Sequence, residues 1–407
     1  MTSRPLAFAL LALACLTAAT TATAQRRLKV YVLAGQSNMQ GHAKIATFDY
    51  LADDPATVPL LARMRDEHGT PRVRDDVWIA YRTGDDGGET SGLLTAGFGA
   101  RNDPARSDDK IGPEFTFGIE LGDALAEPVL LIKAAWGGKS LHTDFRPPSA
   151  GPYEFSAQQL ERLQKQGKDV EQVRREKQQA TGHYYRETIA YVQKVLADPK
   201  RYCPAYDKGA GYELAGFVWF QGWNDMVDRD TYPDRDRDGG YAQYTDCLKH
   251  LIRDVRKDLG APALPFVIGV MGVGGAIEDP KKDAVHHNFR AAMAAAADRA
   301  EFGDRVIAVQ TAPFWDEPLE RIADKFEQLR NLEHALRTKN ARSANADGSM
   351  DDAAQKAHVA KRRAELISAA EESAWQRGAS NGGYHYLGCA KTMARIGIAF
   401  ADALLPH

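Results

Sequence analysis

The sequence predicts an α/β protein built around a central parallel sheet of about five strands, with helices on both faces. Short apolar runs rich in β-branched residues alternate with longer segments of helical periodicity. The runs are apolar almost throughout, which is typical of strands buried on both faces of a parallel sheet. Regular alternation of strand and helix indicates βαβ units and a doubly wound sheet.

Each element follows from its own segment. The expected strands are Leu28–Ala34, Pro128–Ala134, Leu214–Phe220, Pro265–Val270 and Arg305–Gln310. The expected helices are Phe115–Ala126, Tyr184–Ala197, Tyr241–Leu259, Asp283–Ala300 and Cys389–Leu405. In such sheets ligands bind beyond the carboxyl ends of the strands, so we expect the functional residues directly after these runs.

Composition and charge exclude several classes of protein. The 407 residues are 44% hydrophobic and 26% charged, which argues against a disordered or collagen-like chain and against a disulfide-dense miniprotein. A net charge of −3 without a long basic run argues against a nucleic-acid partner.

Residues 1–24 are predicted to be a signal peptide. Arg4 precedes a short apolar stretch, Leu6–Leu16, and Ala22-Thr23-Ala24 forms a small-x-small cleavage site. The alternative, an N-terminal membrane anchor, is disfavoured because the stretch is too short to span a bilayer. We therefore expect a secreted or periplasmic protein that has no membrane contact after cleavage.

The remaining residues, 25–407, are predicted to form one domain, because no Pro- or Gly/Ser-rich linker divides them. Charged helical insertions are expected near 156–182 and 317–377. We expect these to be solvated surface helices rather than partner-binding modules, since charged helix faces usually point to solvent.

No metal or other cofactor is predicted. No Cys/His spacing resembles a zinc site, and after cleavage at most one disulfide is expected, with Cys203–Cys247 as a candidate and Cys389 left as a thiol. Asp234–Gly239 matches the first half of a calcium loop, but Thr245 stands where the bidentate Glu belongs. We therefore expect a solvated loop there.

Residues with chemical potential follow three of the strands. Ser37 comes after the first strand and is either a nucleophile at a strand-to-helix turn or a helix cap. Gly137 and Gly138 follow the second and either direct an amide at a substrate or only form a turn. Asn224 follows the third and is either an amide donor to a developing negative charge or a cap.

His385, just before the last helix, is the candidate general base, because imidazole can take up and return a proton near neutral pH. Taken alone, a histidine among aromatic residues is more often structural. Its position, together with those of Ser37, Gly137 and Asn224, points to a single rim of the sheet, which favours a common site.

These motifs also resemble a known family. GQSNMQG, WGGKS, QGWND, the late GYHYLG and the GPE of Gly112–Glu114 are similar to motifs of the SGNH hydrolase superfamily. The resemblance is strongest to its carbohydrate-esterase branch, which includes sialate O-acetylesterase-like and acetylxylan-esterase-like proteins. It implies a flavodoxin-like, three-layer α/β/α fold and a secreted serine esterase that removes O-acetyl groups from carbohydrate without a cofactor.

The resemblance implies roles for single residues. Ser37 would be the nucleophile and His385 the general base and acid, while the amides of Ser37 and Gly137 or Gly138 and the side chain of Asn224 would form the oxyanion hole. Substrate contacts would come from residues beside these motifs: Gln36, Asn38, Trp136, Gln221, Trp223 and Tyr384.

One position departs from the family pattern. The superfamily commonly places Asp three residues before the histidine, where this sequence has Gly382. His385 would then be oriented by a backbone carbonyl, by Asn381, or by a carboxylate distant in sequence such as Glu114 or Asp316.

Two other functions remain open at this stage. One is a short-chain lipase or thioesterase of the same superfamily, which is disfavoured because the polar segment Thr83–Asp109, expected to be a loop, has too few apolar residues to line an acyl channel. The other is a non-catalytic carbohydrate-binding protein on the same scaffold. The oligomeric state is not predicted.

Overall fold

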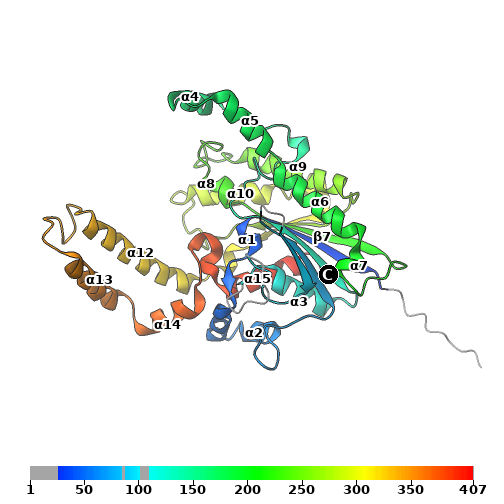
Figure 1. Ribbon diagram of the computed structural model, residues 1–407, viewed down its shortest axis with the longest axis horizontal. Coiled ribbons are helices and arrows are strands. Elements are labelled where there is room, and N and C mark those ends of the chain that lie inside the picture. The colour runs from blue at the N-terminus through cyan, green and yellow to red at the C-terminus, as the bar shows by residue number, and fades with distance from the viewer. Residues whose placement is uncertain (1–25, 85–87, 101–109, 407) are drawn as a thin grey trace, which may run out of the picture.

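The computed structural model describes residues 26–84, 88–100 and 110–406, and its centre is a seven-stranded sheet (Figure 1). The predicted signal peptide, 1–24, lies outside the described residues. All five expected strands are present: β1 (Leu28–Gly35), β6 (Val129–Ala135), β7 (Tyr212–Phe220), β8 (Phe266–Val270) and β9 (Val306–Gln310).

The sheet has two more strands than the sequence indicated. β3 (Val77–Arg82) and β4 (Glu89–Leu93) extend one side of it, in the order β4-β3-β6-β1-β7-β8-β9. β4 is antiparallel to β3, and the other neighbours are parallel. β4 lies within the segment that was expected to be a loop. It escaped prediction because an edge strand pairs on one side only and tolerates polar residues.

Helices cover both faces of the sheet, which confirms the three-layer α/β/α class. α3 (Glu114–Ala124) and α15 (Ala390–Asp402) pack together on one face, and α6 (His183–Ala197), α9 (Ala242–Asp258) and α10 (Ala284–Ala295) lie on the other (Figure 1). Shorter elements complete the fold: α1 (Ser37–Gln40), β2 (Ala43–Lys44), η1 (Ile45–Asp53), α2 (Val58–Met64), β5 (Lys110–Ile111), η2 (Pro148–Ala150), α7 (Pro199–Tyr202), α8 (Trp223–Val227), α11 (Arg299–Phe302), η3 (Gly303–Arg305), η4 (Ala312–Phe314) and η5 (Gly383–Gly388).

The middle of the sheet forms the core. Every residue of β6 is buried, and all but one of β1 are too, which explains why these runs are apolar without alternation. At the carboxyl end of β1 the packing leaves no room for a side chain, because a Cβ on Gly35 would lie 2.2 Å from the carbonyl oxygen of Phe220 in β7. Only glycine therefore fits at the end of β1, directly before the turn that leads into α1.

Two helical excursions leave this core, near the predicted insertions. The first contains α4 (Ala157–Lys165) and α5 (Val170–Ala180), and the second contains α12 (Glu317–Arg337), α13 (Asp352–Leu366) and α14 (Ala369–Gly378). Both extend away from the sheet, α4 and α5 at the top of Figure 1 and α12 and α13 at its left. No residue of α5 or α13 is buried, in keeping with their charged sequences.

Cys203, Cys247 and Cys389 are all buried free thiols, so the candidate Cys203–Cys247 disulfide is not formed. Within the described ranges, no helix is long and apolar enough to cross a membrane.

Candidate functional site

A cavity of about 380 Å³ opens at the carboxyl ends of β6, β1 and β7, which are neighbours in the sheet. It brings together residues from four separate segments of the chain: Gln36, Ser37, Gln40, His42, Gly137, Gly138, Trp223, Asn224, Tyr384 and His385. The connections from β1 and from β7 leave toward opposite sides of the sheet, and crevices of doubly wound folds form at such points.

Ser37 is the first residue of α1 and lies two residues beyond β1. Its side chain is 7% exposed and accepts a hydrogen bond of 3.5 Å from Gln36 Nε2. The buried Gln36 also connects two strands, because its Oε1 accepts from Gln221 Nε2 at 3.1 Å and from the amide of Gly222 at 3.3 Å. The serine is thus held at a defined position between β1 and β7.

A buried ion pair supports α1 from below. Lys133, which is fully buried in β6, donates to Glu114 at 2.7 Å and to the carbonyl oxygen of Gln40, the last residue of α1, at 2.8 Å. Glu114 also accepts from the amide of Gly112 at 2.9 Å. Glu114 therefore fixes the turn that carries Ser37, and it is not the carboxylate that orients His385.

Gly137 and Gly138 follow β6 and pass close to α1. A Cβ on Gly137 would lie 2.9 Å from Gln40 Oε1 and 3.7 Å from Ser37 Cβ. This close approach explains the glycine, since a larger residue would push the loop away from the serine. Both glycines line the cavity, as does Asn224 in the first turn of α8.

His385 lies in η5 and is oriented by Asn381. Its Nδ1 is 2.9 Å from Asn381 Oδ1, and the same oxygen accepts from the amide of Gly382 at 2.8 Å. Because a backbone amide can only donate, the Asn381 atom facing it must be the oxygen, and His385 Nδ1 must carry the proton. The neutral imidazole therefore has its lone pair on Nε2, the form that a general base requires.

The surroundings of His385 favour this neutral form. Burial, and to a lesser extent the charge of Lys110, lower the pKa of His385 to about 4. The His42 ring stacks on the His385 ring, with centroids 3.9 Å apart and planes within 1° of parallel. Tyr384 packs against His385 in an edge-on arrangement, with ring centroids 4.4 Å apart. The sequence offered no sign of His42, because only the fold brings it to His385.

Three of the expected substrate-binding residues do not line the cavity. The Trp136 indole packs between Phe145 and Tyr184 and donates to the carbonyl of Gly84 at 3.2 Å, so it belongs to the core. Asn38 is 3% exposed and Gln221 is 2% exposed. The described lining of the cavity therefore does not include these three residues. The others, Gln36, Trp223 and Tyr384, do line it.

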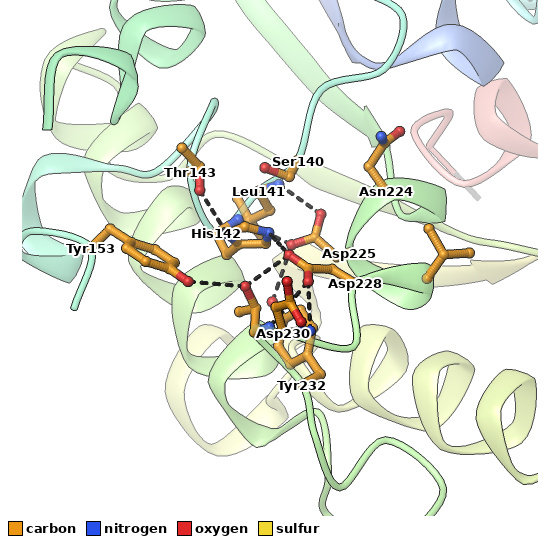
Figure 2. Close-up of polar contacts among 12 residues, drawn as sticks. Ser140, Leu141, His142, Thr143, Tyr153, Asn224, Asp225, Asp228, Asp230 and Tyr232 are labelled. Atoms are coloured by element: carbon orange, nitrogen blue, oxygen red, sulfur yellow. Dashed lines mark hydrogen bonds and ion pairs between the residues drawn. The ribbon is translucent and has the colours of Figure 1, made fainter. Parts of the chain in front are cut away.

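A second polar cluster lies beside the cavity (Figure 2). Asp225, fully buried, accepts from the amides of Leu141 at 2.7 Å and His142 at 3.0 Å. His142 contacts Asp228 through Nε2 at 2.9 Å and Thr143 through Nδ1 at 2.7 Å. These bonds join the loop after β6, which carries both glycines, to α8, which carries Asn224. Sequence reasoning missed this cluster.

Other candidates have structural roles. Asp316 pairs with Lys391 at 2.7 Å and caps α12, so it does not orient His385. In the loop that resembles a calcium site, Asp234 pairs with Arg237 at 3.1 Å. His286 Nδ1 lies 2.7 Å from Asp283, three residues earlier. Across the described part of the chain, no group of three or more His, Cys, Asp or Glu side chains is arranged to hold a metal ion.

The geometry can be compared with known proteins. The family model described as carbohydrate esterase, sialic acid-specific acetylesterase, matches residues 27–304. Among curated proteins, none matches the sequence.

Solved structures resemble the fold at low sequence identity. A protein from Arabidopsis thaliana is 15% identical over 70% of this chain and 85% of its own (TM-score 0.36), and NanS is 13% identical over 70% and 78% (TM-score 0.38). A carbohydrate acetylesterase from Xanthomonas citri is 14% identical over 69% of this chain and 49% of its own (TM-score 0.37).

The family match covers more than half of the chain, including β1, β6 and β7 and the residues that follow them, Ser37, Gly137 and Asn224. The chain therefore belongs to the carbohydrate esterase family of sialic acid-specific acetylesterases and is a carbohydrate O-acetylesterase.

Proposed function

We propose that this enzyme deacetylates carbohydrate by a covalent mechanism in which Ser37 is the nucleophile and His385 the general base. The observation that carries the proposal is the shared cavity, in which Ser37 and His385 lie with Gly137, Gly138 and Asn224. The Asn381 contact supports the role of His385, because it leaves the basic lone pair on Nε2.

In this mechanism Ser37 Oγ attacks the ester carbonyl while His385 Nε2 takes up the hydroxyl proton. The negative charge of the tetrahedral intermediate is stabilised by the amides of Ser37 and of Gly137 or Gly138 and by the Asn224 side chain. His385 then protonates the departing sugar hydroxyl. Water, activated by His385, attacks the acetyl-enzyme and releases acetate by the same route.

Two aromatic side chains support a sugar as the alcohol part of the ester. Trp223 and Tyr384 line the cavity, with ring centroids 5.9 Å apart and planes inclined by 43°, and Tyr384 is 48% exposed. Exposed aromatic faces stack on the apolar faces of sugar rings.

We also propose that the enzyme is exported, on the basis of the predicted signal peptide at 1–24. Mass spectrometry of the protein recovered from culture medium or periplasm tests this, and a mature N-terminus at Gln25 is expected. Recovery of the intact N-terminus would contradict cleavage.

The mechanism is tested by acetate release from acetylated carbohydrates and by p-nitrophenyl acetate hydrolysis. Ser37→Ala should abolish both activities and labelling by a fluorophosphonate. Asn224→Ala should lower kcat by about 10²–10³, the usual effect of losing one oxyanion donor. If Ser37→Ala retains most of the activity, Ser37 is not the nucleophile.

A further inference from the structure

A second cavity, of about 600 Å³, adjoins the catalytic one. Gly138 and Asn224 line both, so the two cavities meet at the proposed oxyanion hole. The second cavity lies between the loop after β6, the end of α8 and helix α5 of the first excursion. A ligand in the catalytic cavity can therefore extend into the second one.

One face of α5 forms the outer wall of this cavity. Val173, Glu176, Lys177 and Ala180 line it, and their spacing of three, one and three residues places them on the same side of the helix. The rest of α5 faces solvent, as its charged sequence predicts. The excursion thus contributes a defined surface beside the active site.

Lys177 is the cation of this wall. Its ammonium lies 4.1 Å from the centroid of the Tyr153 ring, and the structure shows no ion pair for it with any described residue. Burial lowers the pKa of Lys177, while the nearby carboxylates of Asp228 and Asp144 act in the opposite direction. Tyr153 therefore holds a cation at the cavity wall, where its N–H groups can donate to a ligand.

The inner wall is rich in groups that bind hydroxyls. The hydroxyl groups of Ser140 and Thr143 already bond to Asp144 at 2.8 Å and to His142 at 2.7 Å. Together with the carboxylates of Asp144 and Asp228 they line the cavity mainly as hydrogen-bond acceptors. Asp228 is held in place by His142, which lies between Thr143 and Asp228 in Figure 2. Phe155 adds an aromatic face, which is partly exposed.

The charge of the lining selects among ligands. Three carboxylates, those of Asp144, Glu176 and Asp228, line the cavity with one lysine, so an anionic sugar would meet net repulsion. A long acyl chain would displace water from the same carboxylates and offer them no hydrogen-bond donor, which costs free energy. Uncharged hydroxyl groups match the lining best.

We propose that this cavity, between α5 and the loop after β6, is a subsite for a neutral sugar residue linked to the acetylated one. The enzyme then prefers acetylated oligosaccharides to acetylated monosaccharides, with Lys177 and Phe155 contributing to this preference. This inference rests on the proposed function of the catalytic cavity, because the sugar reaches the subsite through it.

The test compares three substrates: p-nitrophenyl acetate, acetylated neutral monosaccharides, and acetylated neutral oligosaccharides such as xylo-oligosaccharides. The variants are Lys177→Met, which keeps an apolar stem, and Phe155→Ala, with Arg175→Met as the matched control on an exposed part of α5. We expect Lys177→Met and Phe155→Ala to lower kcat/KM for the oligosaccharides about tenfold, the effect of one charge-assisted hydrogen bond or stacking contact. Hydrolysis of p-nitrophenyl acetate should stay within about twofold.

Several outcomes would overturn the subsite. These are equal kcat/KM for mono- and oligosaccharides, equal losses on oligosaccharide and p-nitrophenyl acetate, or a preference for acidic oligosaccharides or for long acyl esters. Failure of the catalytic proposal looks different, because Ser37→Ala would then still hydrolyse p-nitrophenyl acetate.

Discussion

Two of the histidines near the cavity, His385 and His142, have different partners. His385 contacts the neutral amide of Asn381 through Nδ1, and its pKa is lowered to about 4 by burial and by Lys110. His142 engages both ring nitrogens, one with Thr143 and the other with the carboxylate of Asp228. Hydrogen bonds with His142 and Thr231, in turn, hold the pKa of Asp228 well below its usual range against the effect of burial.

Under the proposed mechanism, this difference separates a catalytic from a structural histidine. Of these two, only His385 lines the cavity that contains Ser37 and keeps a basic nitrogen for proton transfer. His142 uses its nitrogens to join the loop after β6 to the end of α8. Under the proposed mechanism, an amide positions the general base, whereas the carboxylate–histidine pair connects the two segments that carry the proposed oxyanion donors.

The largest expected effect is the loss of His385, which we compare with the loss of His142. His385→Ala should lower kcat for acetyl-ester hydrolysis by about 10²–10⁴, because general-base catalysis is lost. His142→Gln should lower kcat by less than about tenfold, since its side chain binds no reacting atom. Steady-state kinetics measure kcat for both variants, and circular dichroism checks that each variant is folded. Comparable losses in both variants would make His142 part of the chemistry.

The next largest effect tests whether Asn381 orients His385. Because the proposed mechanism requires a neutral His385, kcat/KM should fall only as pH drops through about 4. Asn381→Asp places a carboxylate at Nδ1, which favours the imidazolium and should move this acidic limb upward by about one to two pH units. The pH profile of kcat/KM for p-nitrophenyl acetate measures it. An unchanged profile in Asn381→Asp would show that Asn381 does not orient the base.

The smallest expected effect concerns the structural histidine. Asp228→Asn removes the charge opposite His142, and the free energy of unfolding should fall by about 1–2 kcal/mol, a value reduced because the Asp228 side chain is 26% exposed. A carboxylate whose pKa is lowered on folding stabilises the folded state fully at pH values above its unfolded pKa of about 3.9. This contribution decreases as the pH falls from there toward the pKa in the folded state. Urea unfolding measures the difference in the free energy of unfolding between the wild type and Asp228→Asn. This difference should therefore be smaller at pH 3.5 than at pH 7. A variant as stable as the wild type at pH 7 would contradict the role of the pair.

The centre of the sheet was predicted from the sequence, whereas the side formed by β3 and β4 was not. β1, β6 and β7 are continuous apolar runs because both faces are buried, a property that hydrophobicity reports directly. β4, with the sequence ETSGL, is an edge strand whose pairing with β3 depends on backbone hydrogen bonds. Such pairing leaves little trace in residue type.

The residues of the candidate site were likewise predicted only in part. Ser37, Gly138, Asn224 and His385 were each expected from a short motif, and all four line one cavity. Trp136 and Gln221 belong to the same motifs, yet neither lines the cavity. Adjacent residues of a turn point in different directions, so a motif alone does not say which of its side chains reaches the cavity.

The sequence by itself determined the α/β class, five of the seven strands of the main sheet and the strand ends at which the candidate site residues lie, because burial and turn chemistry depend on local residue type. Only the tertiary structure decided that Asn381 replaces the usual carboxylate, that His42 stacks on His385, and that one face of α5 borders a second cavity. These features join residues tens to hundreds of positions apart or depend on the backbone of η5, where Tyr386 and Leu387 adopt left-handed conformations. Such contacts arise from packing, which no local pattern encodes.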